Sequence, residues 1–150
     1  MYMNKLLNKL ALEKRSAQVF LCYSHTDNDA VQALCSRLIK DGVEVWLDKE
    51  KLLPGQDWEY EIRNAILKSD LVIVCLSRHF NKQRGYRHEE LKIALDKADS
   101  LPDGEIFIIP ARLEKCDLPN SLSHLHRVDL FEADGYKKLM RALRKHIAST

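Results

Sequence analysis

The sequence predicts an α/β domain built on a doubly wound, five-stranded parallel sheet in the strand order 2-1-3-4-5. Short, wholly apolar runs, typical of strands buried on both faces, alternate along the chain with stretches of helical periodicity. Strands joined by helical crossovers are parallel, and because such crossovers are right-handed, few topologies remain. A length of 150 residues is enough for one domain with its own core.

The elements of the first half follow from apolar runs and the residues that end them. The apolar run at 18–23 predicts a strand buried on both faces. The polar loop 24–29 offers several N-caps for a helix that ends at Asp41-Gly42, a suitable C-terminal pair. A second strand is expected at 43–47, and a long loop with a Pro-Gly turn leads to a helix at about 57–68.

The second half repeats this alternation. The apolar run 71–76 predicts the third strand, and the loop 81–85 leads to a helix that begins at Tyr86. A Pro-Asp-Gly break precedes a fourth strand at 106–111, and a brief fifth strand is expected at 128–130. The last helix has its apolar positions at Leu139, Met140, Leu143 and Ile147.

Composition narrows the class of protein. The 24 Lys and Arg residues balance 22 Asp and Glu residues, with the two signs interspersed, so we expect neither nucleic acid nor a membrane as a direct partner. The longest apolar run has six residues, whereas a bilayer-spanning helix needs roughly 20. The four cysteines form no CxxC pair and no signal peptide is evident, which favours a reduced, cytoplasmic protein.

We expect residues 17–150 to form the domain, and residues 1–16 to be a basic, amphipathic N-terminal extension. The apolar stripe of this extension is short, so it is better suited to packing on its own domain than to a membrane surface. Whether a sensor domain or subunit accompanies the chain is left open.

The helix that begins at Tyr86 carries the most informative residue. Its apolar positions (Leu91, Ala94, Leu95 and Ala98) repeat at helical spacing. Glu89 falls nearly opposite this stripe and should be solvated, whereas Glu90 falls on its flank and can face a cleft. Tyr86 lies one turn before Glu90 on the same side. For an arbitrary helix a solvated acid at the boundary is the simpler interpretation.

Polar and aromatic residues leave the predicted strands at one edge of the sheet. In sheets of this topology, ligands bind beyond the carboxyl ends of the strands, where the first and third strands part. The residues at these ends are Tyr23, Ser24, His25, Asp48 and Ser77. Together with Glu90 they predict a single crevice.

The sequence lacks the motifs of several familiar classes of enzyme and nucleotide-binding protein. The sequence contains no GxGxxG, GxxxxGK[ST] or GxSxG, and the spacing of Cys116, His124 and His126 matches no metal site. We therefore expect no metal and no bound cofactor. What remains is one carboxylate beside aromatic residues. Such a site can cleave a glycosidic bond to a cationic base, because nicotinamide leaves NAD as a neutral molecule and needs no general acid.

Four motifs in order resemble the Toll/interleukin-1 receptor (TIR) domain family over about residues 17–148. They are the segments at 19–24, 43–58, 71–77 and 86–91, which read VFLCYS, VEVWLD with LPG and Trp58, LVIVCLS, and YRHEEL. The resemblance implies a flavodoxin-like fold. In the enzymatic branch it implies NAD cleavage, with Glu90 as the catalytic carboxylate four residues after Tyr86. It also implies that Trp46 stacks on the substrate's base, although Trp46 could equally belong to the core.

The resemblance further implies a loop through which TIR domains contact one another. Its expected assembly residues are Lys51, Leu52, Leu53, Pro54 and Gly55. A mobile loop that gates the cleft is the alternative.

The leading hypothesis is an NAD+ nucleosidase of immune defence or virulence signalling, activated by self-association. It would release nicotinamide and either ADP-ribose or a cyclic isomer. The alternatives are a non-catalytic adaptor that acts through TIR–TIR contacts, and a nucleoside-base transferase that also uses one glutamate.

Overall fold

The computed structural model describes residue 3 and the ranges 17–47, 52–82 and 86–149, without the side chains of residues 86–87 and 147–149. Its strands are β1 (Gln18–Cys22), β2 (Glu44–Leu47), β3 (Leu71–Leu76), β4 (Ile108–Arg112) and β5 (Val128–Asp129). All pairings are parallel and the order is β2-β1-β3-β4-β5, which confirms the predicted topology. The expected division into residues 1–16 and 17–150 stays a prediction, because nearly all of the first segment lies outside the described residues.

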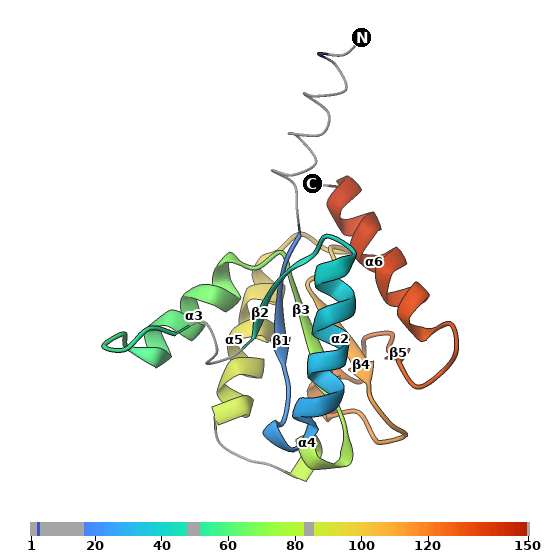
Figure 1. Cartoon of the computed structure of the whole chain (residues 1–150), viewed down its shortest axis with the longest axis horizontal. Helices are drawn as coiled ribbons and strands as arrows, with labels where there is room; N and C mark the ends of the chain where they lie inside the picture. The colour runs from blue at the N-terminus through green and yellow to red at the C-terminus, as the bar shows by residue number, and fades with distance from the viewer. Residues whose placement is uncertain (1–2, 4–16, 48–51, 83–85, 150) are drawn as a thin grey trace.

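Helices cover both faces of the sheet (Figure 1). The longer helices are α2 (Asn28–Lys40), α3 (Trp58–Lys68), α5 (Tyr86–Ser100) and α6 (Gly135–Ser149). Shorter turns of helix are η1 (His25–Asp27), α4 (Arg78–Lys82) and η3 (Asn120–Leu122). No helix among the described residues is both long and apolar enough to cross a membrane.

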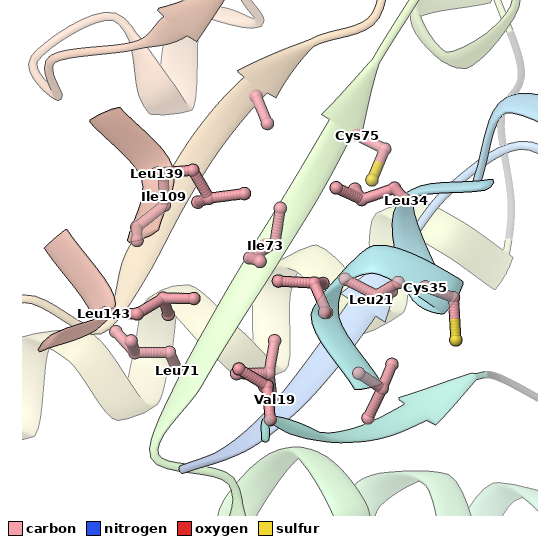
Figure 2. Close-up of a cluster of buried hydrophobic side chains, with 14 of the residues drawn as sticks. Val19, Leu21, Leu34, Cys35, Leu71, Ile73, Cys75, Ile109, Leu139 and Leu143 are labelled. Carbon is pink, nitrogen blue, oxygen red and sulfur yellow. The ribbon is translucent and has the colours of Figure 1, made fainter. Parts of the chain in front are cut away.

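Alternation along the central strands divides the core into two clusters. Val19 and Leu21 of β1 point to the face that α2 and α6 cover, as Figure 2 shows. Phe20 and Cys22 point to the opposite face, which is covered by α3 and α5. Successive side chains of a strand face opposite sides, so one apolar run supplies both clusters. This alternation decides which residues of β1 can reach the helix that carries Glu90.

Two short helices at the carboxyl edge were not predicted. We expected a polar loop where η1 lies, and predicted no helix between the third strand and the helix at Tyr86, where α4 lies. The hydroxyl of Ser77 connects the two helices. It accepts a hydrogen bond from the Phe80 backbone N–H at 3.0 Å and donates one to a carboxylate oxygen of Asp27. A serine that caps a helix in this way satisfies an amide that would otherwise lack a partner.

The last strands are shorter than predicted. β4 begins at Ile108 instead of residue 106, and β5 has two residues instead of three. β5 pairs only through Val128 with Ala111 and Asp129 with Arg112. Gly135 opens α6 against this short strand, where a Cβ would lie 2.0 Å from the carbonyl oxygen of Asp129. The start of α6 therefore packs closely against the end of β5.

Candidate active site

Glu90 lies at the floor of a cleft between α3 and α5. The residue is only 3% exposed, although it lies in the second turn of a surface helix. The cleft has a volume of about 580 Å³. Because α5 packs against β1 as well as α3, the helix presents this carboxylate toward the sheet. The residue is thus more deeply buried than a position on the flank of the apolar stripe suggested.

The thiol of Cys22 contacts the Glu90 carboxylate. Cys22 Sγ donates to Glu90 Oε1 at 3.8 Å, and both side chains are buried. Cys22 is the last residue of β1 and points to the face of the sheet that α5 covers. The contact therefore connects the carboxyl end of the central strand to the floor of the cleft.

The walls of the cleft carry more negative than positive charge. Among the described residues that line it, the acids are Asp57, Glu59, Glu89, Glu90 and Asp96, and the bases are Arg63 and Lys92. Five carboxylates against two cations leave a formal charge of −3 at neutral pH. A positively charged group is therefore favoured in this cleft.

The helical-face prediction separated the two neighbouring glutamates correctly. Glu89 is exposed at the mouth of the cleft, whereas Glu90 lies at its floor. Leu91 and Ala94 of the predicted stripe are buried in the core. One step along a helix turns a side chain by about 100°, which is enough to move a carboxylate from solvent to interior.

Trp46 lies on the same face of the sheet as Glu90. Its ring stacks on Phe20 with centroids 5.5 Å apart and an interplanar angle of 15°. The side chain is half-buried against the cluster under α3 and α5, so part of the indole remains accessible. Both alternatives for Trp46 thus have a physical basis, because one ring surface packs on the core and the rest can meet a ligand.

The other predicted residues at the sheet edge do not all meet at this cleft. Tyr23 packs in the opposite cluster, under α2 and α6, with its ring edge-on to His25 at 6.0 Å. Ser24 is fully buried, and Ser77 is engaged by Asp27 and the α4 backbone. His25 is exposed on η1. The structure therefore brings Trp46 to the face of Glu90 and places Tyr23 on the other face.

Some predicted residues fall outside the description. Asp48, Lys51 and the side chain of Tyr86 are among them. Of the other assembly residues, Leu52 is half-buried and Leu53 is 67% exposed.

The Pro-Gly segment forms a turn beside the cleft. The Gln56 N–H donates to the Leu53 carbonyl at 3.1 Å, and Gly55 has a φ of 90°, as a type II turn requires at its third residue. Asp57 follows the turn and caps α3, accepting hydrogen bonds from the N–H groups of Glu59 and Tyr60.

Sequence reasoning missed the α3 wall and the Cys22 contact. Tyr60, Ile62 and Arg63 line the cleft opposite α5. Arg63 follows the buried Ile62 directly, so a flank argument like that used for Glu90 could have found it. The Cys22 contact depends on how α5 lies over β1, which local periodicity does not encode. The described residues contain no group of three His, Cys, Asp or Glu side chains that could hold a metal.

The sheet is parallel and doubly wound, with helices on both faces and a polar cleft near the carboxyl ends of its strands. These features define the class of flavodoxin-like α/β domains. Within this class, the family model described as the TIR domain matches residues 19–143. The chain belongs to the TIR domain family.

Two curated proteins and one solved structure extend this comparison. The chain is 27% identical over 134 residues (88% of this chain) to the uncharacterized protein y4cD of Sinorhizobium fredii. It is 36% identical over 63 residues (41% of this chain) to the NAD(+) hydrolase TcpA of a Theionarchaea archaeon. It spans 21% and 19% of these relatives, about a fifth of their length. The TIR domain of the Toll-related receptor TRR-2 from Hydra magnipapillata superposes with a TM-score of 0.70 at 25% identity, covering 89% of this chain and 99% of that one.

Proposed function

We propose that this TIR domain is an NAD+ nucleosidase that breaks the bond between nicotinamide and ribose. The products are nicotinamide and either ADP-ribose or a cyclic isomer. One observation carries the proposal: Glu90, the one carboxylate that is buried among the described residues, lines the floor of a cleft on the same face of the sheet as Trp46. The relative named NAD(+) hydrolase, which matches part of this chain, supports the same reaction.

The reaction requires the site to stabilise one developing positive charge. As the bond breaks, its electron pair moves to the pyridine nitrogen, and the positive charge of the nicotinamide ring passes to the ribose carbon. The leaving group is neutral and needs no proton. The Glu90 carboxylate stabilises the cationic ribose electrostatically or by forming a covalent bond to it. Water, or a group of the same dinucleotide in the cyclising reaction, then attacks that carbon and loses a proton.

The charge of the cleft fits the two ends of the proposed substrate. The excess of carboxylates favours the cationic nicotinamide ring and the cationic transition state. Arg63 and Lys92 are the cations in the same walls, and we assign them to the pyrophosphate. Trp46 offers a flat surface for the base, and we keep it as the stacking residue.

The remaining predicted substrate residues keep distinct proposed roles. Ser24, Ser77 and His25 lie at the carboxyl edge, where Ser77 organises η1 and α4. We propose that they shape the edge of the site, together with Asp48. Tyr23 supports the same edge from the opposite face. Tyr86 stays proposed as an aromatic beside Glu90 on the basis of spacing alone.

The biological setting is also a proposal. We infer that the domain is activated when copies associate through the assembly residues 51–55, in immune defence or virulence signalling. A sensor domain or subunit would then bring the copies together.

A non-catalytic adaptor is the second candidate. The observation that favours it is the exposed Leu53 on a rigid Pro-Gly turn, a surface suited to a protein partner. An adaptor of this kind would bind other TIR domains without turning over NAD+.

The test compares two glutamates on one helix. Glu90→Gln removes the buried charge and should lower kcat/KM for NAD+ at least about 100-fold, because a preorganised charge near the reacting carbon is lost. Glu89→Gln makes the same change at the exposed mouth of the cleft and should retain activity within about threefold. Products are separated by chromatography after incubation with NAD+, and thermal unfolding confirms that both variants are folded.

Two results would count against the proposal. Full activity in Glu90→Gln would remove Glu90 from the reaction. No turnover of NAD+ by the wild-type chain at any concentration, together with binding to another TIR domain, would decide for the adaptor.

A further inference from the structure

We propose that Cys22 is a positioning residue, whose thiol donates a hydrogen bond that keeps the Glu90 carboxylate ionised and in place. The inference rests on the proposed function for its catalytic meaning, although the contact itself is independent of that function. It assigns a role to a cysteine that composition alone would class as a small hydrophobe.

The geometry carries the first step. Cys22 Sγ lies 3.8 Å from Glu90 Oε1, and the two residues are 1% and 3% exposed. Cys22 is held rigidly, because it pairs with Val74 at the end of the interior strand β1. Glu90 is held by α5, whose next residue, Leu91, is buried in the core. Donor and acceptor are thus fixed by two separate elements.

The energetic argument concerns the ionised form of Glu90. Burial disfavours a charged carboxyl group and so favours its protonation. The acids that line the cleft act in the same direction, namely Asp57 and Glu59 from α3 and Glu89 and Asp96 from α5. The bases Arg63 and Lys92 oppose them. A donor directed at Oε1 from the sheet stabilises the anion where water is excluded.

The ionised form is the one the reaction uses. A protonated Glu90 could not stabilise a cationic ribose, so the fraction of ionised enzyme limits the rate at low pH. A donor that favours the anion therefore extends activity toward lower pH. Cys22 acts in this account through Glu90 and does not touch the substrate.

Another buried thiol provides the matched control. Cys75 lies on the neighbouring strand β3 and is also fully buried, but it points to the face covered by α2 (Figure 2). Burial there, with Asp27 nearby, raises the pKa of the Cys75 thiol to about 12. Cys75→Ala thus removes an equal volume from the same sheet on the face away from Glu90.

The experiment measures the titration of Glu90 directly, in the full chain without substrate. The side-chain carboxyl carbon of Glu90 is followed by NMR and identified by its absence in Glu90→Gln. Cys22→Ala should raise the titration midpoint by about one pH unit, because the donor is lost. Cys22→Ser keeps a donor on a shorter side chain and should give a midpoint between those of Cys22→Ala and wild type. Cys75→Ala should leave the midpoint unchanged.

The acid limb of kcat/KM for NAD+ should move with the midpoint. An unchanged midpoint in Cys22→Ala would overturn the proposal, even if that variant were less stable or less active. A midpoint that rises equally in Cys22→Ala and Cys75→Ala would overturn it as well, since a general loosening of the sheet would then explain both. If the wild-type chain does not turn over NAD+, the proposed function fails, while the NMR titration still decides whether Cys22 holds Glu90 ionised.

Discussion

At the scale of single residues, the ion pair between Arg112 and Asp129 links the last two strands of the sheet. Arg112 donates from Nε to Asp129 Oδ1 at 2.6 Å and from Nη2 to Oδ2 at 2.8 Å. Both side chains are nearly buried, with 13% and 14% exposed. The same guanidinium donates to the Cys116 carbonyl at 3.0 Å. Because β5 has two residues, this charge-assisted pair adds a strong side-chain link to its short backbone pairing with β4.

Asp129→Asn should lower the free energy of unfolding by about 2–4 kcal/mol at pH 7, because it leaves a poorly solvated guanidinium without its counter-charge. Hydrogen bonds from Arg112 lower the pKa of Asp129 in the folded protein. The stabilisation is therefore complete above the unfolded pKa of about 3.9 and is lost as pH falls through the lower, folded value. Urea unfolding of both proteins across this range should show the difference shrinking toward zero.

Asp134→Asn is the control for this prediction. Its pair with Lys138 is exposed on both sides, so the variant should lose no more than about 1 kcal/mol. An equal loss in the two variants would show that the pair at β5 is no stronger than a surface pair.

At the scale of elements, Lys97 fastens α5 to the end of α3. Its ammonium donates to the Leu67 carbonyl and, at 2.8 Å, to the Ser69 carbonyl, and it lies 4.5 Å from the centroid of the Phe107 ring. Burial lowers the pKa of Lys97, and the nearby Asp70 opposes this shift. The last carbonyls of a helix lack partners within it, so a cation at that end is favourable. The two helices that form the walls of the cleft are thus joined near their C-terminal ends.

Lys97→Met replaces the lysine by an unbranched apolar side chain of similar length and removes the hydrogen bonds to the Leu67 and Ser69 carbonyls. We expect a loss of about 1–2 kcal/mol, measured as a decrease in Tm of about 3–6 °C. Lys68→Met is the control, because Lys68 is exposed on α3 and makes no ion pair within the described part of the chain. Equal Tm values for Lys97→Met and wild type would mean that water satisfies the Leu67 and Ser69 carbonyls as well as the Lys97 ammonium does.

The predicted elements were most accurate where apolar residues repeat without interruption. The run 71–76 is β3, with the same bounds, because six consecutive buried residues leave no alternative to a central strand. The short helices η1 and α4 were missed because they depend on the Ser77 hydroxyl and Asp27, which are 50 residues apart. Such long-range side-chain bonds have no local pattern.

At the scale of the whole molecule, the proposed activation depends on contacts between copies. Leu53 is exposed on the turn that precedes α3. If copies associate through this turn and the association completes the site, specific activity should rise with protein concentration. Light scattering at the same concentrations should then detect an oligomer, and Leu53→Asp should remove both this oligomer and the rise in activity.

Ile39→Asp makes a matched change on α2, where Ile39 is 58% exposed on the opposite face. It should keep the concentration dependence of wild type. Specific activity that stays constant over a wide dilution series, with Leu53→Asp fully active, would favour a loop that only gates the cleft.

The candidate site was only partly predictable. Glu90 could be chosen over Glu89 because a helix fixes the direction of neighbouring side chains. The α3 wall and the Cys22 contact required the packing of α5 on both α3 and β1, which depends on the whole fold. Tyr23 was expected beside Glu90 because both lie near one edge of the sheet, but strand alternation sends Tyr23 to the other face.

The position of β2 at the edge of the sheet has a consequence for local opening. β2 has four residues and, within the described parts of the chain, pairs with β1 alone, whereas β1 is flanked on both sides. Edge elements with few partners open more often than central ones, on a timescale that hydrogen exchange reports. Trp46, the proposed stacking residue, therefore belongs to the part of the sheet that loosens first. Cys22 belongs to a strand that is flanked on both sides and opens later, so the proposed site can release a flat base while the donor to its carboxylate stays in place.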